Sequence, residues 1–446
     1  MHMKPNLELA ISSARETKEV MIGSDILKDT PYLFKKAFPG KNAIIIADAI
    51  TWKIAGEEVF GYLSNSGIIV EPSFIFGEAK PYAEFENVVK LEEAIKAVDA
   101  IPIAVGSGTL NDLTKLAAAR NNRPYMCVAT AASMDGYSAF GASITFEGSK
   151  QTFNCPAPTV ILADIEVIRN APSIMTASGY ADLYAKITAG ADWILADALG
   201  VESIDSTAWS IVQDGLRDAL ADPSGAKAGK EQAITPLVEG LLLGGFAMQW
   251  AKSSRPASGA EHQFSHLWNM EHHLHNGETP SHGFQVGIAT LAITLLYESM
   301  LRTSFDDLNI ESCLEKWPEW NELESVAHGL FRETDFLDTA INQSKQKYIT
   351  KDELSVQLKK LQFIWPNLKT RLLGQLVPSQ RVRENLMAVG APVSSEQIGI
   401  SLSRMRNSFV RAWFIRSRFT ILDLGMRTGY LGKWLDELYD MNELKT

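Results

Sequence analysis

The sequence contains only three cysteines in 446 residues, Cys127, Cys155 and Cys313. Three widely spaced thiols argue against a disulfide framework and against a thiolate metal site. Basic residues are also few, with 42 Lys and Arg against 53 Asp and Glu, so the formal net charge is −11. Because nucleic-acid binding depends on positive charge, we expect no nucleic-acid partner.

The first 13 residues lack the basic flank and continuous apolar core of a signal peptide. The most apolar long stretch, residues 234–251, contains Pro236, Glu239 and three glycines and is short for a membrane span. We therefore expect a buried core helix there, no membrane span, and a cytoplasmic protein.

Hydrophobic content of 46% and charged content of 21% are typical of a globular protein. From about residue 40 to 170, short β-branched runs alternate with helical spacing at residues 85–98 and 110–120. The strand-like runs are continuous and apolar, which is typical of a parallel sheet covered by helices on both faces. The sequence thus predicts an α/β, doubly wound, mostly parallel sheet domain over residues 1–171. Its predicted strands are residues 43–47, 67–70, 101–105, 125–129 and 158–162.

After about residue 170 the strand patterns stop and amphipathic helices take over. An all-α domain is therefore predicted over residues 172–446, with the boundary near Pro172. Residues 303–350 are more polar and are interrupted by Trp317-Pro318, so we expect a peripheral insertion. The predicted helices are residues 177–195, 235–251, 284–301, 351–365, 380–389 and 394–420.

Two loops follow neighbouring predicted strands. In the first, Gly106-Ser107-Gly108 joins a strand to a helix, and such a turn lets backbone N–H groups and a helix N-terminus approach an anion. The second, residues 130–138, follows the next strand, so the two loops could frame one dinucleotide. Asp48 ends the first predicted strand, where an acidic residue can accept from an adenosine ribose. A plain tight turn at the glycines and a helix cap at Asp48 are the alternatives.

Six of the eight histidines lie within residues 262–282. Ser258 and Glu261 match a capping box, which predicts a helix from Gly259. His262 and His266 are then four residues apart on one helix face. His282 precedes Gly283 and opens the next helical run, so a turn could bring it toward His262. The remaining three, His272, His273 and His275, are interpreted as surface or lip residues.

Two imidazoles that hold a catalytic metal usually need a carboxylate as well, with one position left open for substrate. The best candidate is Asp182, which lies on an otherwise apolar helix and needs a partner if it is buried. Asp192 is the alternative carboxylate, with a structural role.

Five ordered motifs occur together: 106–112 (GSGTLND), 130–136 (TAASMDG), 179–182 (GYAD), 259–266 with both histidines, and His282-Gly283. In combination they resemble the sn-glycerol-1-phosphate dehydrogenase family, which belongs to the dehydroquinate-synthase-like and iron-containing alcohol dehydrogenase superfamily. Residues 415–423 (IRSRFTILD) also resemble the bacterial branch of that family.

The resemblance implies metal ligation by Asp182, His262 and His282, and substrate contacts from Asp135, His266 and Asp182. Catalytic roles fall to His266 and Asp182. Lys186 stands where iron-type alcohol dehydrogenases have a further histidine, so we expect three protein ligands and zinc, with nickel as the alternative. Contacts to NAD, with NADP as the alternative, are expected from Asp48, Gly106, Gly108, Thr109, Leu110, Asn111, Asp112, Thr130, Ala131, Ala132, Ser133 and Ser138.

The implied reaction interconverts dihydroxyacetone phosphate and sn-glycerol-1-phosphate, a phosphorylated ketone and polyol pair. The bound metal would polarise the C2 oxygen while hydride passes between carbon and nicotinamide. The alternatives are a glycerol dehydrogenase, a dehydroquinate-synthase-like lyase, and a non-catalytic sensor of cofactor or metabolite, which need not keep all three ligands. A homodimer is the first expectation for the assembly.

Overall fold

The computed structural model describes residues 5–77, 81–147 and 149–440. The chain divides into two compact units. The first comprises Met1–Leu183, Ser206–Ala257 and Ala388–Gly390, and the second comprises Tyr184–Asp205, Ser258–Met387 and Ala391–Thr446. These units do not follow a single boundary near Pro172, because the helix α13 (Glu231–Ala251) packs against α7 (Ile165–Arg169) and β1 (Glu19–Gly23) of the first unit. A functional division at Pro172 stays a prediction.

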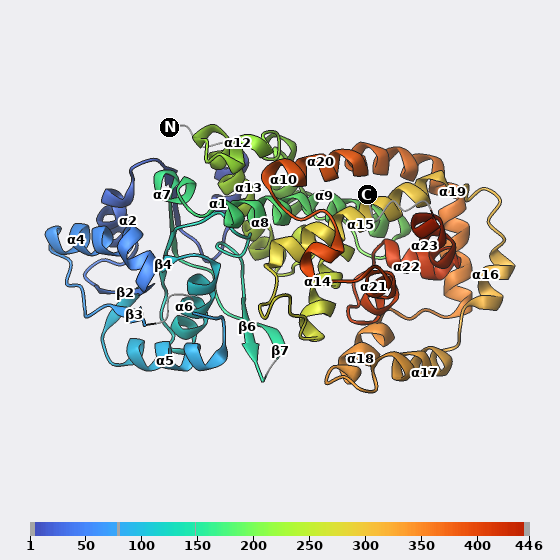
Figure 1. Ribbon diagram of the computed structural model, residues 1–446, viewed down its shortest axis with the longest axis horizontal. Helices are drawn as coiled ribbons and strands as arrows, with labels where there is room; N and C mark the ends of the chain where they lie inside the picture. Colours follow the sequence, from blue (N-terminus) through green and yellow to red (C-terminus); the bar gives the residue numbers. More distant parts are fainter. Residues whose placement is uncertain (1–4, 78–80, 148, 441–446) are drawn as a thin grey trace. The chain divides into compact units, whose positions relative to one another are not determined.

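The first unit contains a six-stranded sheet in which every paired strand is parallel (Figure 1). This confirms the predicted fold class. The strand order is β1-β8-β5-β4-β2-β3. The strands other than β1 are β2 (Asn42–Asp48), β3 (Phe74–Phe76), β4 (Ala100–Gly106), β5 (Met126–Ala129) and β8 (Val160–Asp164).

Helices cover both faces of this sheet. On one face α2 (Thr30–Ala37) and α4 (Glu57–Asn65) pack into a core that includes the β2 side chain of Ile45. On the other face α5 (Phe85–Lys96) and α6 (Gly108–Arg120) pack against the strand side chains that point to that side, such as Ile44 of β2. Successive residues of a strand point to opposite faces, so a strand covered on both sides must be apolar throughout. Each buried Ile, Leu or Val stabilises the fold by roughly 1.5–3 kcal/mol.

Four details of the strands differ from the prediction, and the first is that the short edge strand β3 was not predicted. Residues 67–70 form no strand, and only an isolated bridge joins Val70 to Ala43. The edge strand β1 was not predicted, because its five residues are all half-buried and show no alternation. A separate antiparallel hairpin, β6 (Ala142–Phe146) and β7 (Ser149–Phe153), was also missed. These elements are short or polar, so their hydrophobic pattern is weak.

The remaining helices of the first unit follow the sheet in sequence, except α1, which precedes it. The predicted helix 177–195 is divided at Ala185, where α8 (Ser173–Tyr184) ends and α9 (Lys186–Leu199) of the second unit begins. The apolar stretch 234–251 lies in α13 and is buried along most of its length, as predicted. The others are α1 (Pro5–Ser13), α10 (Ser206–Gln213), α11 (Leu216–Ala219) and α12 (Pro223–Lys227).

The second unit is helical, and the described residues after β8 form no strand, only an isolated bridge between His275 and Glu278. At its centre α15 (His282–Arg302) packs against α9, α14 (Ala260–Met270), α22 (Ile421–Thr428) and α23 (Leu431–Asp440). Within the described part of the chain, α15 alone is long and apolar enough to cross a membrane, and 83% of its apolar window is buried inside the protein. It is therefore a core helix by its packing.

The predicted helix 394–420 is wrong over its last residues. It consists of the 3₁₀ turn η4 (Ser395–Ile398) and α21 (Leu402–Phe414), and a non-helical segment then leads to α22. Thr420 caps α22 through a capping box with Asp423, which explains why the chain leaves the helix before this point. The predicted helices at 351–365 and 380–389 are α19 (Lys351–Gln375) and α20 (Ser379–Val389).

The polar segment 303–350 forms three helices, α16 (Ile310–Lys316), α17 (Trp320–Phe331) and α18 (Leu337–Lys347). Its last helix packs against α21. There the buried Lys347 ammonium lies 3.1 Å from Asp423 Oδ1 and 4.4 Å from the ring centre of Trp413. Burial lowers the pKa of Lys347 to about 8, although Asp423 opposes the shift. The segment is thus tied into the helical unit by a buried ion pair.

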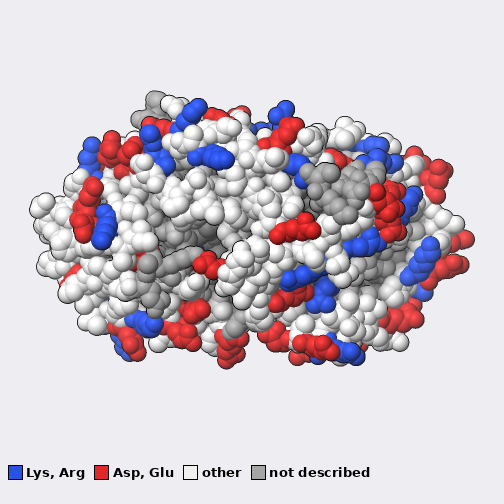
Figure 2. Space-filling view, viewed as in Figure 1, with Lys and Arg blue, Asp and Glu red and all other residues white. Residues whose placement is uncertain are grey.

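Charged side chains are mixed in sign on the face of the molecule shown in Figure 2. Acidic and basic residues lie side by side there rather than in separate fields. That face offers no continuous positive surface of the kind that follows a phosphate backbone.

Candidate metal and nucleotide site

The carboxyl ends of three neighbouring strands bring together the predicted nucleotide-binding segments. Asp48 is the last residue of β2, Gly106 is the last residue of β4, and Thr130 directly follows β5. These strands are adjacent in the order β5-β4-β2. Ligands of open parallel sheets bind at this edge, so the first unit presents the three segments where a dinucleotide would lie.

The turn after β4 is packed tightly around its two glycines. A Cβ atom on Gly106 would lie 2.3 Å from Leu110 Cδ1, and one on Gly108 would lie 2.5 Å from Met134 Cε. Neither glycine has a positive φ, so each provides space rather than a left-handed backbone. Ser107 is the N-cap of α6. The unpaired N–H groups of this helix start are suited to an anion, and Thr109 is half-buried beside them.

Two further residues of this motif are engaged in packing. Asn111 is fully buried, and its Oδ1 accepts from the Tyr125 hydroxyl at 3.0 Å. Asp112 Oδ2 accepts from the Ser143 N–H at 3.2 Å. Both side chains therefore join α6 to neighbouring segments, and their contact with a cofactor stays a prediction.

The loop after β5 is joined to the glycine turn through its backbone. Thr130 N–H donates to the Gly106 carbonyl at 3.1 Å. The Tyr137 hydroxyl donates to the Ala131 carbonyl at 2.7 Å and lies 3.5 Å from the Ser133 hydroxyl. The two predicted cofactor loops thus form one hydrogen-bonded surface.

The same loop is held against two helices. At Gly179 of α8 a Cβ atom would lie 2.1 Å from the Ala132 carbonyl oxygen, so only glycine fits. The Ser138 hydroxyl donates to the Leu242 carbonyl of α13 at 2.6 Å. Ser138 therefore has a structural contact, and a role in cofactor binding stays a prediction.

Asp48 acts as a helix cap, the alternative that the sequence left open. Its Oδ1 accepts from the N–H groups of Ile50 at 2.9 Å and Thr51 at 2.7 Å. In return the Thr51 hydroxyl oxygen accepts from Asp48 N–H at 3.1 Å, which completes a capping box. A cap at the carboxyl end of β2 is compatible with a ribose contact through the second oxygen, which stays a prediction.

Asp182 is a fully buried carboxylate on α8. The Asp135 N–H donates to its Oδ2 at 3.0 Å. A carboxylate removed from water needs hydrogen bonds and a positive partner. The backbone of the predicted substrate residue Asp135 therefore supplies one of the contacts that Asp182 needs.

His262 lies in the first turn of α14. This helix begins at Ala260 with Gly259 as its N-cap, so the N-cap residue provides no side-chain cap. The predicted capping box of Ser258 and Glu261 is therefore wrong. Asp192 Oδ2 accepts from the Ala260 N–H at 2.7 Å and takes the place of a local cap.

Glu261 is fully buried beside His262, and its Oε1 lies 2.8 Å from His262 Nδ1. The same carboxylate accepts from Gly259 N–H at 2.6 Å and from the Thr188 hydroxyl at 2.8 Å. Burial alone would raise the pKa of Glu261, but the bonds from His262 and Gly259 outweigh it and hold the pKa below its usual value. The carboxylate accepts from His262 Nδ1–H, so in the neutral ring the lone pair that can bind a metal lies on Nε2.

His282 at the start of α15 is oriented by a chain of hydrogen bonds. Gln285 Nε2 lies 2.9 Å from the Pro280 carbonyl, which can only accept, so Gln285 Oε1 is an acceptor. The Ser265 hydroxyl, 3.2 Å from this oxygen, therefore donates to it. Ser265 then accepts from His282 Nδ1–H at 3.2 Å, so in the neutral ring the lone pair lies on Nε2.

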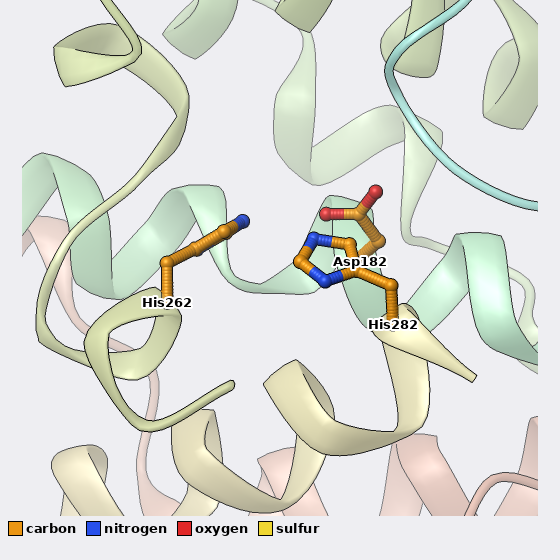
Figure 3. A group of neighbouring side chains, drawn as sticks. All are labelled: Asp182, His262 and His282. Carbon is orange, nitrogen blue, oxygen red and sulfur yellow. The ribbon is translucent and has the colours of Figure 1, made fainter. Parts of the chain in front are cut away.

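One ligand atom each from Asp182, His262 and His282 lies within 4.8 Å of the other two (Figure 3). The two imidazole rings are 5.3 Å apart at their centres. Because both rings have Nδ1 engaged by an oxygen, both present Nε2, and the third ligand is an anion. One carboxylate and two neutral imidazoles form a donor set that fits a divalent metal with an open coordination position.

His266 lies one turn beyond His262 on α14 and is half-buried. It does not belong to the group of three ligands, in keeping with the separate role predicted for it. Of the other histidines, His272 is exposed, as expected for the surface. The prediction for His273 is wrong, because this ring is buried and bonds to the Ile398 carbonyl at 2.6 Å.

Asp192 has the structural role that the sequence offered as its alternative. Besides capping α14, its Oδ1 accepts from the Tyr297 hydroxyl at 2.6 Å and from Ile421 N–H at 2.8 Å. One buried carboxylate thus joins α9 to α14, α15 and α22.

Sequence reasoning missed the residues that support the ligands, Glu261, Ser265 and Gln285. Glu261 was named only as part of a capping box. A glutamate next to a candidate histidine ligand is a usable signal, since metal-binding imidazoles usually donate their other N–H to an oxygen. Ser265 and Gln285 act across two helices, and no local pattern marks them.

The chain is similar in sequence to dehydrogenases of known activity. Residues 21–172 match the family model described as iron-containing alcohol dehydrogenase. The glycerol-1-phosphate dehydrogenase [NAD(P)+] of Halalkalibacterium halodurans is 32% identical over 65% of this chain and 73% of its own length. The protein of the same name from Geobacillus thermodenitrificans is 30% identical over 86% of each chain.

Among solved structures, a glycerol dehydrogenase from Schizosaccharomyces pombe has a TM-score of 0.59 and 17% identity, and the match covers 96% of this chain and 92% of that one. This likeness establishes the fold. The sequence matches identify the family, because they reach 30% identity or more and extend over most of the relatives' own lengths. The chain belongs to the glycerol-1-phosphate dehydrogenase family.

Proposed function

We propose that this protein interconverts dihydroxyacetone phosphate and sn-glycerol-1-phosphate, with NAD(P) as the hydride carrier and one divalent metal. Family membership supports the reaction, since the relatives are named glycerol-1-phosphate dehydrogenase [NAD(P)+]. The observation that carries the proposal is the pair of imidazoles with Nε2 preset for a metal, together with the buried carboxylate of Asp182.

Asp182, His262 and His282 are the residues that would hold the metal. When bound, a divalent ion supplies Lewis-acid polarisation of the ketone oxygen. Zinc suits one carboxylate and two imidazoles, and nickel suits the same donors. The hydrogen bonds of Glu261 and Ser265 keep the rings oriented before any metal arrives, so little rearrangement is needed on binding.

The other residues bind and orient the reactants. We assign the pyrophosphate of the dinucleotide to the N-terminus of α6 after Gly106 and Gly108, where backbone N–H groups and the helix dipole favour an anion. We assign a substrate hydroxyl to Asp135, whose backbone already contacts Asp182. His266, half-buried and one turn beyond a ligand, is assigned the proton that moves to or from the C2 oxygen.

The test is oxidation of NADH or NADPH, followed by absorbance, with dihydroxyacetone phosphate as substrate and zinc or nickel supplied. We expect steady turnover and a product with sn-glycerol-1-phosphate stereochemistry. Comparable turnover with unphosphorylated dihydroxyacetone would favour a glycerol dehydrogenase instead. Cofactor binding without net consumption for any of these ketones would favour the lyase or the sensor.

Two expectations from the sequence remain proposals. We expect a homodimer, which light scattering of the purified protein measures directly. We also propose a cytoplasmic location, in keeping with three buried cysteines that form no disulfide with one another.

A further inference from the structure

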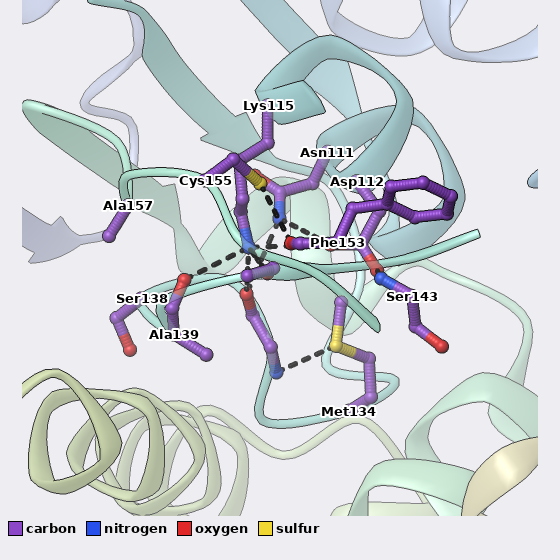
Figure 4. Close-up of polar contacts among 12 residues, drawn as sticks. Asn111, Asp112, Lys115, Met134, Ser138, Ala139, Ser143, Phe153, Cys155 and Ala157 are labelled. Atoms are coloured by element: carbon purple, nitrogen blue, oxygen red, sulfur yellow. Dashed lines mark hydrogen bonds and ion pairs between the residues drawn. The ribbon is translucent and has the colours of Figure 1, made fainter. Parts of the chain in front are cut away.

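Lys115 is a buried lysine on α6 that no step of the proposed reaction uses. Its ammonium donates to three backbone carbonyls of one loop, those of Gly136 at 2.9 Å, Ala139 at 3.0 Å and Gly141 at 2.9 Å (Figure 4). An ammonium group has three N–H donors, so every donor has a carbonyl acceptor. Asp112 Oδ1, 3.4 Å away, balances the charge.

The loop that Lys115 binds has no regular secondary structure between β5 and β6. None of its carbonyls at 136, 139 and 141 belongs to a helix or strand, and buried carbonyls need partners. The Gly136 carbonyl also accepts from Ala139 N–H at 3.3 Å and from Asn111 Nδ2 at 3.4 Å. A buried charge is costly unless it is paired and hydrogen bonded. Lys115 thus supplies a donor to each of three loop carbonyls, and the loop supplies the acceptors that the buried charge needs.

This loop leads directly to the metal ligand Asp182. Gly136, whose carbonyl Lys115 binds, follows Asp135, whose N–H donates to Asp182 Oδ2 at 3.0 Å. Any movement of the Gly136 peptide group moves the Asp135 backbone with it. The Asp135 N–H bonds Oδ2 of Asp182, so a shift of the Asp135 backbone would change a contact that orients this carboxylate.

We propose that Lys115 is a positioning residue of the metal site: by holding three carbonyls of the 136–141 loop, it fixes the Asp135 N–H against Asp182 and so sets the orientation of the metal-binding carboxylate. The inference rests on the proposed function for the role of Asp182. It predicts an effect on metal affinity from a side chain that touches neither metal nor substrate.

The same unit offers a matched control in Arg123. Its Nη1 donates to the carbonyls of Ile95 at 2.8 Å, Val98 at 2.5 Å and Ala100 at 2.9 Å. This is a similar contact, one cation on three carbonyls, which lie at the end of α5, in the following turn and at the start of β4. It lies where the chain enters β4, at the opposite edge of the sheet from the glycine turn. Loss of Arg123 should therefore destabilise the unit without reaching Asp182.

The experiment compares Lys115→Met, Lys115→Gln and Arg123→Met with the wild-type protein. Zinc affinity is measured by competition with a chelator, the unfolding midpoint by urea titration, and kcat and KM with dihydroxyacetone phosphate. We expect Lys115→Met to lose about 10–100-fold in zinc affinity, the usual effect of disturbing the partner of a metal ligand. Lys115→Gln, which keeps two donors, should lie between it and wild type, and Arg123→Met should bind zinc like wild type.

Unchanged zinc affinity in a folded Lys115→Met protein would overturn the proposal, as would an equal loss in Arg123→Met. If Lys115→Met does not fold, wild-type zinc affinity in Lys115→Gln would overturn it instead. A wild-type protein that binds zinc but does not reduce dihydroxyacetone phosphate would refute the proposed reaction, while the order of zinc affinities would still decide the role of Lys115. A wild-type protein that binds neither zinc nor nickel would refute both.

Discussion

Glu261 and His262 are adjacent in the sequence and are joined by a side-chain hydrogen bond of 2.8 Å. Consecutive residues of a helix do not normally face each other. The contact is possible here because both residues lie in the first turn of α14, where Glu261 also accepts from the Gly259 N–H that precedes the helix. One carboxylate thus contacts the helix start and favours the Nδ1–H tautomer of the imidazole that we propose as a metal ligand.

Replacement of the Glu261 carboxylate tests whether it supports metal binding through His262. We expect Glu261→Gln to lower zinc affinity by roughly 10–100-fold, because an amide is a weaker acceptor and can also offer an N–H that disfavours the Nδ1–H tautomer. Thr188→Val is the matched control, since it removes the bond of 2.8 Å to the other carboxylate oxygen, together with a bond of 3.0 Å to the Ala185 carbonyl, and leaves the Glu261–His262 bond in place. Zinc titration of both folded variants provides the measurement. Equal affinity of Glu261→Gln and wild type would show that Glu261 serves the helix alone.

The two histidines of α14 should separate binding from turnover. His262→Ala removes a ligand and should lose metal and activity together. His266→Ala should keep the metal but lower kcat by roughly 10²–10⁴-fold, the usual contribution of a general acid or base. Elemental analysis and steady-state kinetics of each variant measure the two effects. Full metal occupancy in His262→Ala would move the metal site elsewhere, and normal turnover in His266→Ala would make that histidine structural.

Much of this architecture could be predicted because its signals are local. The buried strands are continuous apolar runs, and the spacing of His262 and His266 places them on one helix face. Asp182 could be nominated because a charge on an apolar helix requires a partner. The prediction of one helix over 394–420 is wrong at its end, because Thr420 and Asp423 form a capping box that begins a new helix, α22.

The supporting contacts could not be predicted in the same way. Lys115 reaches carbonyls 21 to 26 residues away, and Ser265 meets Gln285 from the next helix. Asp192 caps α14 from 68 residues earlier in the chain. Such contacts depend on tertiary packing, and a lysine or serine in a helical pattern reads as an ordinary surface residue until the fold is known.

The buried thiols give a prediction for pH. Burial raises the pKa of Cys127 and of Cys155 to about 12, although the charge of Lys115 opposes the shift. In an unfolded chain the pKa of a thiol is about 8.5. Between that pH and about 12 the unfolded chain releases protons that the folded chain keeps, so these thiols lower stability as pH rises through the window.

We therefore compare the urea midpoints of Cys127→Ala and wild type at about pH 8 and about pH 10. The midpoint of Cys127→Ala should fall less between these two pH values than that of wild type. In the native protein both thiols should also react slowly with a disulfide reagent, and rapidly once urea unfolds the chain. Equal pH dependence of the two proteins, or fast reaction of the folded one, would contradict the raised pKa values.

Cofactor preference depends on Asp48 at the end of β2. Its Oδ1 caps α3 (Ala49–Thr51), and this fixes the side chain at the edge where the dinucleotide is assigned. A carboxylate there can accept from a ribose 2′-hydroxyl and would repel a 2′-phosphate, so NADH should be preferred over NADPH. Asp48→Asn keeps an oxygen for the cap and removes the charge.

Asp48→Asn should therefore reduce the preference for NADH over NADPH while the start of α3 stays folded. The measurement is kcat/KM for both cofactors in the two proteins, with the urea midpoint as the check on the cap. Loss of the helix cap would lower the free energy of unfolding by about 1 kcal/mol. An unchanged urea midpoint in Asp48→Asn would therefore show that the cap is kept. Because screening acts over about 8 Å at physiological salt, the net charge of −11 contributes little and the local carboxylate decides. A wild-type enzyme that prefers NADPH would show that Asp48 caps the helix and does not meet the ribose.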